Sequence, residues 1–315
     1  MPEAKAITRK SRPTLAPRSD RGRPRSKRSF NSLWMLGGAV GAVAIAGAVL
    51  WLNRPDGAAQ DDSSSAYVGG DLHSFVAAPL EPGLLFTGGH QAVSVSKDGG
   101  LTWTAVESLQ GADAMGWAVL DAGIWVGGHP GLEVSTDGGR SFEPRNDGLP
   151  ATDIHALGGT GSMLLAASPA AGFLVSSDAG TTWEVRNPTA GQSFMGALLV
   201  DPSDPDHIVA PDMRVGAVQS LDGGRSWTAL GGVPGAMWVS WDPANLDQIV
   251  VSGLGAAAMS GDGGATWEPL DVPPGSSIVQ IDPADPATWY AAALTEDGTV
   301  AVSVSSDGGT TWDPL

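Results

Sequence analysis

Cysteine is absent from the 315 residues of this chain, and tyrosine occurs only twice. Without cysteine, disulfide bonds and thiol catalysis are excluded. Basic residues are scarce over most of the chain: ten of the 17 Lys and Arg lie within residues 1–30, which leaves seven for the rest against 32 Asp and Glu. The negative charge of the chain after residue 30 repels phosphate groups, and we therefore expect no nucleic-acid partner.

Glycine and tryptophan, in contrast, are plentiful, with 44 and 12 residues. Many glycines and regularly spaced aromatic residues are typical of short strands joined by tight turns. One pattern, Ser-x-Asp-x-Gly-x-Thr/Ser-aromatic, occurs six times and is first seen at Ser96–Trp103. The other copies are Ser135–Phe142, Ser176–Trp183, Ser220–Trp227, Ser260–Trp267 and Ser305–Trp312.

The spacing of this pattern predicts the fold. The aspartates of the six copies are Asp98, Asp137, Asp178, Asp222, Asp262 and Asp307, at intervals of 39, 41, 44, 40 and 45 residues. A repeat of ~40–50 residues is the length of one four-stranded propeller blade. The sequence therefore predicts an all-β, six-bladed β-propeller.

Each copy has the chemistry of a tight turn between two strands, here called a Ser-x-Asp turn. The aspartate accepts hydrogen bonds from backbone N–H groups, and glycine adopts positive φ without steric cost. The hydroxyls satisfy further groups of the turn, and the terminal aromatic ring suits packing between neighbouring blades. These roles are structural, so we expect the six aspartates to carry no chemistry.

A second region precedes the repeats. Residues 33–52, LWMLGGAVGAVAIAGAVLWL, form an uncharged run, and about 20 apolar residues span a bilayer as a helix. The basic segment before it is expected to stay cytoplasmic. We expect a retained single-pass anchor in a cell membrane with an extracytoplasmic propeller; a cleaved signal peptide, whose apolar region usually runs ~7–15 residues, is the alternative.

The chain is therefore divided into a basic cytoplasmic tail (1–32), a transmembrane anchor (33–52), a polar linker (53–66) and a propeller (67–315). The expected blades are about 71–110, 111–150, 151–190, 191–232, 233–273 and 274–315. Tyr67 and Val68 are candidates to add a strand to the last blade, a point that the sequence leaves open. We expect a monomeric propeller whose membrane contact is the N-terminal helix.

Strand direction assigns the remaining polar residues to faces. Strands alternate in direction within a blade, so the Ser-x-Asp turns, between third and fourth strands, share a face with the turns between first and second strands. The opposite face, around the central channel, is the expected site of function. Four histidines are predicted there as ligand-binding residues and candidate metal ligands: His73, His90, His129 and His155.

Three carboxylates and one arginine accompany these histidines. Asp71, Asp113 and Asp153 are the catalytic candidates, and Arg214 is a further ligand-binding candidate. Imidazoles with carboxylates suit a divalent transition metal such as Zn, Cu, Mn or Fe, and they also suit acid–base chemistry. A polar channel lining that holds water is the third interpretation. The fifth histidine, His207, is expected at the surface of the other face.

The Ser-x-Asp pattern resembles the Asp-box, or BNR, repeat of sialidases and related β-propellers, which implies that the turns lie on the outer rim. Residues 71–315 resemble exported bacterial Asp-box proteins described as glycosyl hydrolases, in which a His-rich strand and a Gly-His turn precede the first box. DLHSF (71–75) and TGGHQ (87–91) match that pattern, with Asp71 replacing one histidine and His90 standing alone. Photosystem assembly propellers and sortilin-type receptors share the same boxes.

Two classes of function follow. A sialidase needs an arginine cluster for the substrate carboxylate and a tyrosine nucleophile; only Arg214 is predicted on the expected face, and neither Tyr67 nor Tyr290 is. The favoured interpretation is a non-catalytic exported module that binds a glycan, a protein partner or a metal. The alternative is another glycosidase, which requires two carboxylates ~5–10 Å apart.

Overall fold

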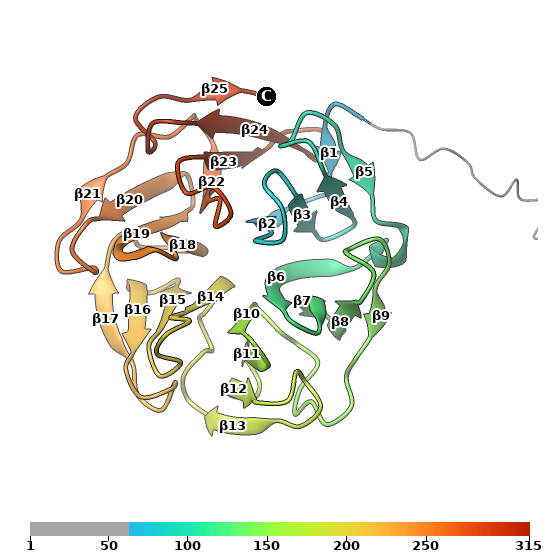
Figure 1. Ribbon diagram of the computed structural model, residues 1–315, viewed down its shortest axis with the longest axis vertical. Helices are drawn as coiled ribbons and strands as arrows, with labels where there is room; N and C mark the ends of the chain where they lie inside the picture. Colours follow the sequence, from blue (N-terminus) through green and yellow to red (C-terminus); the bar gives the residue numbers. More distant parts are fainter. Residues whose placement is uncertain (1–62) are drawn as a thin grey trace, which may run out of the picture. The chain divides into compact units, whose positions relative to one another are not determined.

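The chain folds into antiparallel sheets, and each Ser-x-Asp turn lies in its own four-stranded unit. The computed structural model describes residues 63–315. Figure 1 shows the units arranged in a ring, with the first strand of each nearest the centre and the fourth on the outside. One short 3₁₀ helix, Glu107–Leu109, interrupts the strands.

The strands follow the chain in groups of four. The first two units contain β2 (Leu72–Ala77), β3 (Leu85–Gly89), β4 (Val93–Ser96), β5 (Thr104–Ala105), β6 (Asp113–Leu120), β7 (Gly123–His129), β8 (Gly131–Ser135) and β9 (Glu143–Pro144). The next two contain β10 (Ala156–Thr160), β11 (Met163–Ser168), β12 (Gly172–Ser176), β13 (Glu184–Asn187), β14 (Gly196–Val200), β15 (Ile208–Asp212), β16 (Gly216–Ser220) and β17 (Thr228–Gly231). The last two contain β18 (Trp238–Asp242), β19 (Asn245–Gly253), β20 (Ala256–Ser260), β21 (Glu268–Pro269), β22 (Ser276–Ile281), β23 (Trp289–Leu294), β24 (Thr299–Ser305) and β25 (Asp313–Pro314).

The hydrophobic core lies between neighbouring units. Strands with a neighbour on each side within their unit can be fully buried: β12, the third strand of its unit, is buried at every residue, as expected for strands covered on both faces. Aromatic rings join one unit to the next: Phe86 of β3 stacks on Trp117 of β6 with ring centroids 5.0 Å apart. Phe173 and Trp227 meet edge to face, with ring centroids 5.1 Å apart. Burial of these rings holds the units side by side.

All six Ser-x-Asp turns have one hydrogen-bond pattern, illustrated by the turn at Ser176. The buried Ser176 hydroxyl accepts the Gly180 N–H at 2.8 Å and donates to Oδ1 of Asp178 at 2.8 Å. The carboxylate also accepts the N–H of Thr182 at 2.8 Å and its hydroxyl at 2.7 Å. The Ser hydroxyl and the Asp carboxylate thus pair with donors of the turn itself, which explains why these residue types repeat.

The aromatic residues that end the six turns differ in burial. Trp103 and Phe142 are buried, with 2% and 5% of their surface exposed. The other four are only half-buried: Trp183, Trp227, Trp267 and Trp312. The fourth strand that follows each ring is the outermost one of its unit (Figure 1).

Strand β1 (Ala66–Tyr67) joins the last unit to the first. It pairs antiparallel with the beginning of β24, while β25 pairs with the end of the same strand. The Val68 N–H donates to the Gly298 carbonyl at 3.0 Å, and the Val68 carbonyl accepts the Gln91 N–H at 3.1 Å. Ser63 also pairs with Trp103. Residues 63–66, assigned to the linker from sequence, are therefore part of the folded unit.

The third and fourth units share one continuous sheet, which the sequence did not indicate. Their innermost strands, β10 and β14, pair in parallel from Ala156 to Gly158. A side chain at Gly158 would place its Cβ 1.8 Å from the Leu198 carbonyl oxygen. Glycine at this position therefore permits the two innermost strands to hydrogen-bond directly.

The predicted cytoplasmic tail, the transmembrane anchor and most of the linker lie outside the described residues. Within residues 63–315, no helix has the length and apolar character needed to cross a membrane. His207, expected as a surface residue, is 22% exposed, lies 3.7 Å from Oδ2 of Asp201 and packs on the Trp241 ring. It is therefore half-buried, because Asp201 and the Trp241 ring of the next unit cover it.

Candidate metal centre

Seven side chains gather at one end of the first three units, and we call them the His–Asp cluster. They are Asp71, His73, His90, Asp113, His129, Asp153 and His155. They come from the starts of the first strands β2, β6 and β10 and the ends of the second strands β3 and β7. In antiparallel pairs, the start of one strand and the end of the next lie at the same edge of the sheet.

The Gly-Gly-His sequences bring the two strands of each hairpin unusually close. A Cβ at Gly89 would lie 1.9 Å from the Asp71 carbonyl oxygen, and one at Gly128 would lie 1.4 Å from that of Asp113. No side chain fits at either position. The histidine after each glycine pair is therefore held against the aspartate of the neighbouring strand.

A β-bulge positions His73. The pairing of β2 with β3 shifts register between Leu72 and Ser74, so His73 is the extra residue. A bulge redirects the side chain that it contains. Here the His73 side chain is only 11% exposed and is directed into the cluster. Strand alternation alone would not have assigned this direction.

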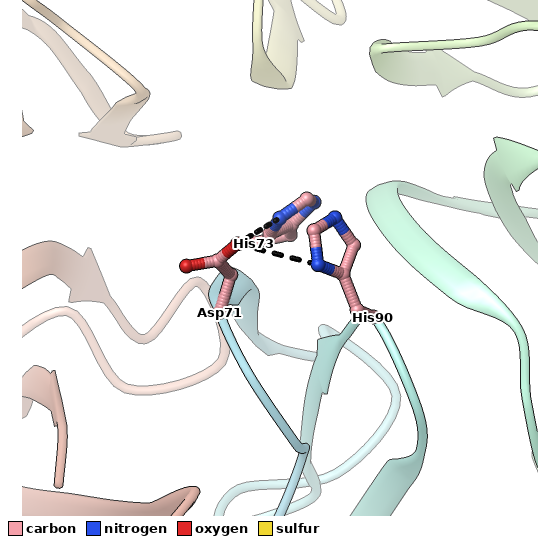
Figure 2. Close-up of side chains that lie close together, drawn as sticks. All are labelled: Asp71, His73 and His90. Carbon is pink, nitrogen blue, oxygen red and sulfur yellow. Dashed lines mark ion pairs between the residues drawn. The ribbon is translucent and has the colours of Figure 1, made fainter. Parts of the chain in front are cut away.

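One group of ligand atoms is formed by Asp71, His73 and His90, whose side chains point toward one another (Figure 2). Oδ2 of Asp71 lies 3.2 Å from Nδ1 of His90 and 4.0 Å from Nε2 of His73. The two imidazole rings meet edge to face, with centroids 4.3 Å apart. One nitrogen from each ring thus faces the same carboxylate oxygen.

A second group of the same composition is formed by His129, Asp153 and His155. Oδ1 of Asp153 lies 2.8 Å from Nε2 of His155 and also contacts Nε2 of His129. The two rings are again edge to face, with centroids 5.5 Å apart. In each group the three ligand atoms lie within 4.8 Å of one another.

Asp113 lies between the two groups. Its Oδ1 is 3.1 Å from Nδ1 of His73, and its Oδ2 is 2.8 Å from Nδ1 of His129 and 3.7 Å from Nε2 of His90. The Asp113 side chain is 12% exposed. Although Nδ1 of His73 and Oδ1 of Asp113 are close, they do not align as a hydrogen bond, and both atoms are buried.

The cluster shifts the protonation equilibria of its members. Burial by itself would raise the pKa of Asp113, but the contacts with His73 and His129 outweigh it and leave the pKa below the ordinary value. Burial lowers the pKa of His129, yet hydrogen bonds to Asp113 and Asp153 raise it overall. For His155 burial prevails, and its pKa is lowered despite Asp153. Asp113 is therefore ionised at neutral pH, as a partner for imidazole N–H groups must be.

Two imidazoles and one carboxylate form a donor set suited to transition metals. Ligand atoms about 2.0–2.1 Å from a tetrahedral zinc ion lie about 3.3 Å from one another. The 3.2 Å between Asp71 and His90 is close to this value, and the 4.0 Å between Asp71 and His73 and the 2.8 Å between Asp153 and His155 each differ from it by less than ~1 Å. Three protein ligands leave a further position open for water or another ligand.

Arg214, also predicted as a ligand-binding residue, lies elsewhere. Its backbone N–H donates to Oδ1 of Asp212 at 2.7 Å, and it lines a cavity of about 370 Å³ with Ser193, Phe194 and Trp227. The predicted carboxylates Asp71, Asp113 and Asp153, in contrast, are all brought into the cluster, each beside at least two histidines.

Sequence reasoning identified the members of the cluster but not the residues that shape it. Gly89 and Gly128 have no ligand atoms, yet they set the distance between the strands. The signal for them was present, since GGH occurs at the end of the second strand in both of the first two units. No sequence pattern distinguished Asp113 from Asp71 and Asp153, so its position between the two groups could not be predicted.

Comparison with known proteins shows the fold alone. No family model matches the chain, and no curated protein matches it. Among solved structures, a GH74 xyloglucanase from Xanthomonas campestris is 20% identical with a TM-score of 0.54, covering 81% of this chain and 46% of its own. The chain therefore spans less than half the length of that enzyme.

Two further structures give the same result. A nidogen/laminin complex matches with 13% identity and a TM-score of 0.57, over 74% of this chain and 92% of the other. A Bacteroides thetaiotaomicron protein of unknown function matches with 10% identity and a TM-score of 0.58, over 78% and 72%. The xyloglucanase and nidogen structures are β-propellers, and together with the ring of antiparallel sheets they show that this chain has a β-propeller fold.

Proposed function

We propose that this protein is an extracytoplasmic β-propeller that binds divalent transition-metal ions at the His–Asp cluster. The observation that carries the proposal is the convergence of two imidazole nitrogens and one carboxylate oxygen within 4.8 Å, in each of two groups. Four of the five histidines of the chain contribute to these groups. Histidine is the commonest metal ligand among side chains.

The donor set indicates how the ion would act. A site with three protein ligands keeps a coordination position open, in contrast to the four-ligand sites that only stabilise a fold. The side chains of His90 and His129 are about half exposed, at 47% and 50%, so the cluster is accessible from solvent. The open position would accept an oxygen ligand from water, a glycan or a protein partner. The bound ion would then itself contact the molecule that the propeller binds.

The test is metal retention by the purified full-length chain. After incubation with Zn²⁺ or Cu²⁺ and removal of free ions by gel filtration, elemental analysis should find bound metal in the wild type. His90→Ala together with His155→Ala should abolish retention, because each group loses one of its three ligands. His207→Ala is the matched control, since this histidine also lies beside an aspartate but outside the cluster; it should retain the wild-type amount.

Metal-free wild-type protein, or equal retention by the double variant and the wild type, would overturn the proposal. Circular dichroism of each variant establishes that the fold is intact. A reduction of retention in His207→Ala alone would likewise contradict the assignment of the metal to the cluster.

The architecture proposed for the whole chain has six blades, one for each four-stranded unit, with the Ser-x-Asp turns as Asp boxes of the BNR type. The common hydrogen-bond pattern of the six turns supports this assignment. We further propose that residues 33–52 anchor the propeller outside the cytoplasm. A periplasm- or surface-specific reporter fused after Leu315 should be active, and the protein should resist carbonate extraction; carbonate release of the intact chain would contradict the anchor.

A glycosidase remains the second candidate, favoured by the three carboxylates on one face and by the similarity to a xyloglucanase fold. Against it, each carboxylate contacts imidazoles, and the pKa of Asp113 is lowered, whereas a carboxylic general acid needs a raised pKa. A screen of chromogenic glycosides tests it directly. Turnover that Asp71→Asn or Asp153→Asn abolishes would establish the hydrolase and displace the metal proposal as the principal function.

A further inference from the structure

We infer that the His–Asp cluster holds two metal ions in two separate sites, and that Asp113 is the positioning residue shared by both. The inference rests on the proposed metal-binding function and specifies the number and organisation of the ions. The first site consists of Asp71, His73 and His90, and the second of His129, Asp153 and His155.

The ligand atoms converge at two points. In the first site, Nδ1 of His90 and Nε2 of His73 face Oδ2 of Asp71, at 3.2 and 4.0 Å. In the second site, Nε2 of His155 lies 2.8 Å from Oδ1 of Asp153, and Nε2 of His129 contacts the same oxygen. Each site thus has its own carboxylate, and neither needs a ligand from the other.

The opposite ring nitrogens identify the role of Asp113. An imidazole binds a metal through one nitrogen and usually donates the N–H of the other to a carboxylate, a carbonyl or water. His73 and His129 both direct Nδ1 toward Asp113, at 3.1 Å to Oδ1 and 2.8 Å to Oδ2. One carboxylate therefore occupies the outer position for a histidine of each site, with one oxygen for each.

Burial makes this arrangement specific. Nδ1 of His73 and Oδ1 of Asp113 are shielded from solvent, and neither has a hydrogen-bond partner among the described residues. When Nε2 of His73 binds an ion, its Nδ1 must carry the proton, and Oδ1 of Asp113, 3.1 Å away, is the acceptor with which a rotation of the ring would align it. A buried, unpaired N–H would be costly, so Asp113 selects the tautomer of His73 that leaves Nε2 free for the metal.

Charge favours the same organisation. Two divalent ions in neighbouring sites repel each other, and an anion between them reduces this repulsion. The Asp113 carboxylate lies between the two groups, 3.1 Å from Nδ1 of His73 and 2.8 Å from Nδ1 of His129. Its substitution should therefore weaken both sites, whereas loss of Asp71 or Asp153 should remove only one.

The experiment is calorimetric titration of the metal-free full-length chain with Zn²⁺. The wild type should bind two ions per chain, and Asp71→Ala and Asp153→Ala should each bind one. Asp113→Asn, which preserves the shape of the side chain, should still bind two ions, each about 10–100-fold more weakly, as is typical for loss of an outer-shell partner. His207→Ala should be indistinguishable from the wild type.

A tautomer measurement separates positioning from general destabilisation. Imidazole ¹⁵N spectra of the zinc-loaded wild type should show His73 and His129 protonated at Nδ1. In Asp113→Asn this preference should be reduced for both rings, while the His207 signals and the melting temperature remain those of the wild type. An effect confined to the melting temperature would overturn the positioning role.

The outcomes distinguish the inference from the function on which it rests. No bound zinc would refute the metal-binding proposal itself. One ion in the wild type would leave that proposal standing and overturn the two-site inference. Two ions with Asp113→Asn weakening one site alone would refute the shared role of Asp113. If Asp113→Asn fails to fold, the stoichiometries of Asp71→Ala and Asp153→Ala still decide between one site and two.

Discussion

At the scale of single residues, two polar networks serve different ends. In the Ser-x-Asp turns the Ser hydroxyl and the Asp carboxylate pair with donors of the turn itself, whereas the His–Asp cluster contains a buried nitrogen of His73 and a buried oxygen of Asp113 without hydrogen bonds. Buried polar groups in folded proteins are nearly always paired. Two of the four buried side-chain atoms that lack a partner among the described residues thus lie in the cluster, and the other two are Nε1 of Trp125 and Nε1 of Trp183.

The hydroxyl of Ser176 illustrates the first kind of network. It is buried and accepts the N–H of Gly180, which is buried as well. Ser176→Ala leaves this donor unpaired, so we expect the free energy of unfolding to fall by about 1–3 kcal/mol. Urea denaturation measures the change. The exposed neighbour Ser177 is the matched control, and Ser177→Ala should stay within about 0.5 kcal/mol of the wild type; equal effects of the two substitutions would contradict the role of the hydroxyl.

The aspartates of the turns predict acid sensitivity. Hydrogen bonds from the following Thr or Ser hydroxyl and N–H lower the pKa of Asp178, Asp222 and Asp307 from the ordinary 3.8 to about 2. Because the unfolded chain takes up protons first, the stability present above pH ~4 is lost as the pH falls toward 2. Melting temperatures recorded from pH 6 to pH 2 should show this decline, and Asp178→Asn should show a shallower one. Parallel curves for the two proteins would contradict the assignment.

At the scale of elements, the hairpin is the unit that builds the candidate site. The β2–β3 and β6–β7 pairs each bring an aspartate at one strand start against a histidine at the other strand end. Both pairs contain a register shift near this end, after Leu72 and after Ala114. Bulges are common beside functional sites, where they redirect side chains. The cluster is therefore a property of hairpin geometry as much as of residue type.

Gly128→Ala tests the close approach within the second hairpin. The added methyl group would lie 1.4 Å from the Asp113 carbonyl oxygen, so the strands must separate. We expect a loss of about 1–3 kcal/mol in unfolding free energy, typical of overpacking, and weaker metal retention. Gly70→Ala is the control, because a Cβ there meets nothing within 4 Å. Wild-type metal retention by Gly128→Ala would show that the glycine does not position His129.

At the scale of the molecule, closure of the ring depends on a short segment before the first unit. Strand β1 pairs with β24, and Val68 hydrogen-bonds to the sixth unit through its N–H and to the first through its carbonyl. A closed ring leaves each unit a neighbour on both sides, which protects the sheet faces from water. We therefore expect residues 63–315 to unfold in one cooperative transition.

Val68→Ala examines this closure. Val68 is fully buried. The substitution removes both of its γ-methyl groups, so we expect the free energy of unfolding to fall by about 1–3 kcal/mol. Thermal and urea denaturation should show a lower midpoint with a single transition. Val215, 47% exposed, provides the control, and Val215→Ala should be nearly neutral. A second, separate transition in Val68→Ala would indicate that the units do not unfold together.

Local chemistry was sufficient to predict much of this protein. The six Ser-x-Asp patterns specify the repeat because each turn is stabilised within eight residues of sequence. Alternation of strand direction then assigned His73, His90, His129 and His155 to one edge, since that rule needs only the order of strands. The composition of the cluster was predictable for the same reason.

What only the tertiary structure decided depends on contacts between distant segments. The grouping of the histidines around Asp71 and Asp153, with Asp113 between them, results from a bulge at one residue and from glycines that admit a neighbouring backbone. The pairing of β1 with β24 and of β10 with β14 joins segments that no short-range pattern relates. Such contacts form because closure of the ring buries the faces of its sheets. This burial depends on segments from the whole chain, so no single stretch of sequence predicts it.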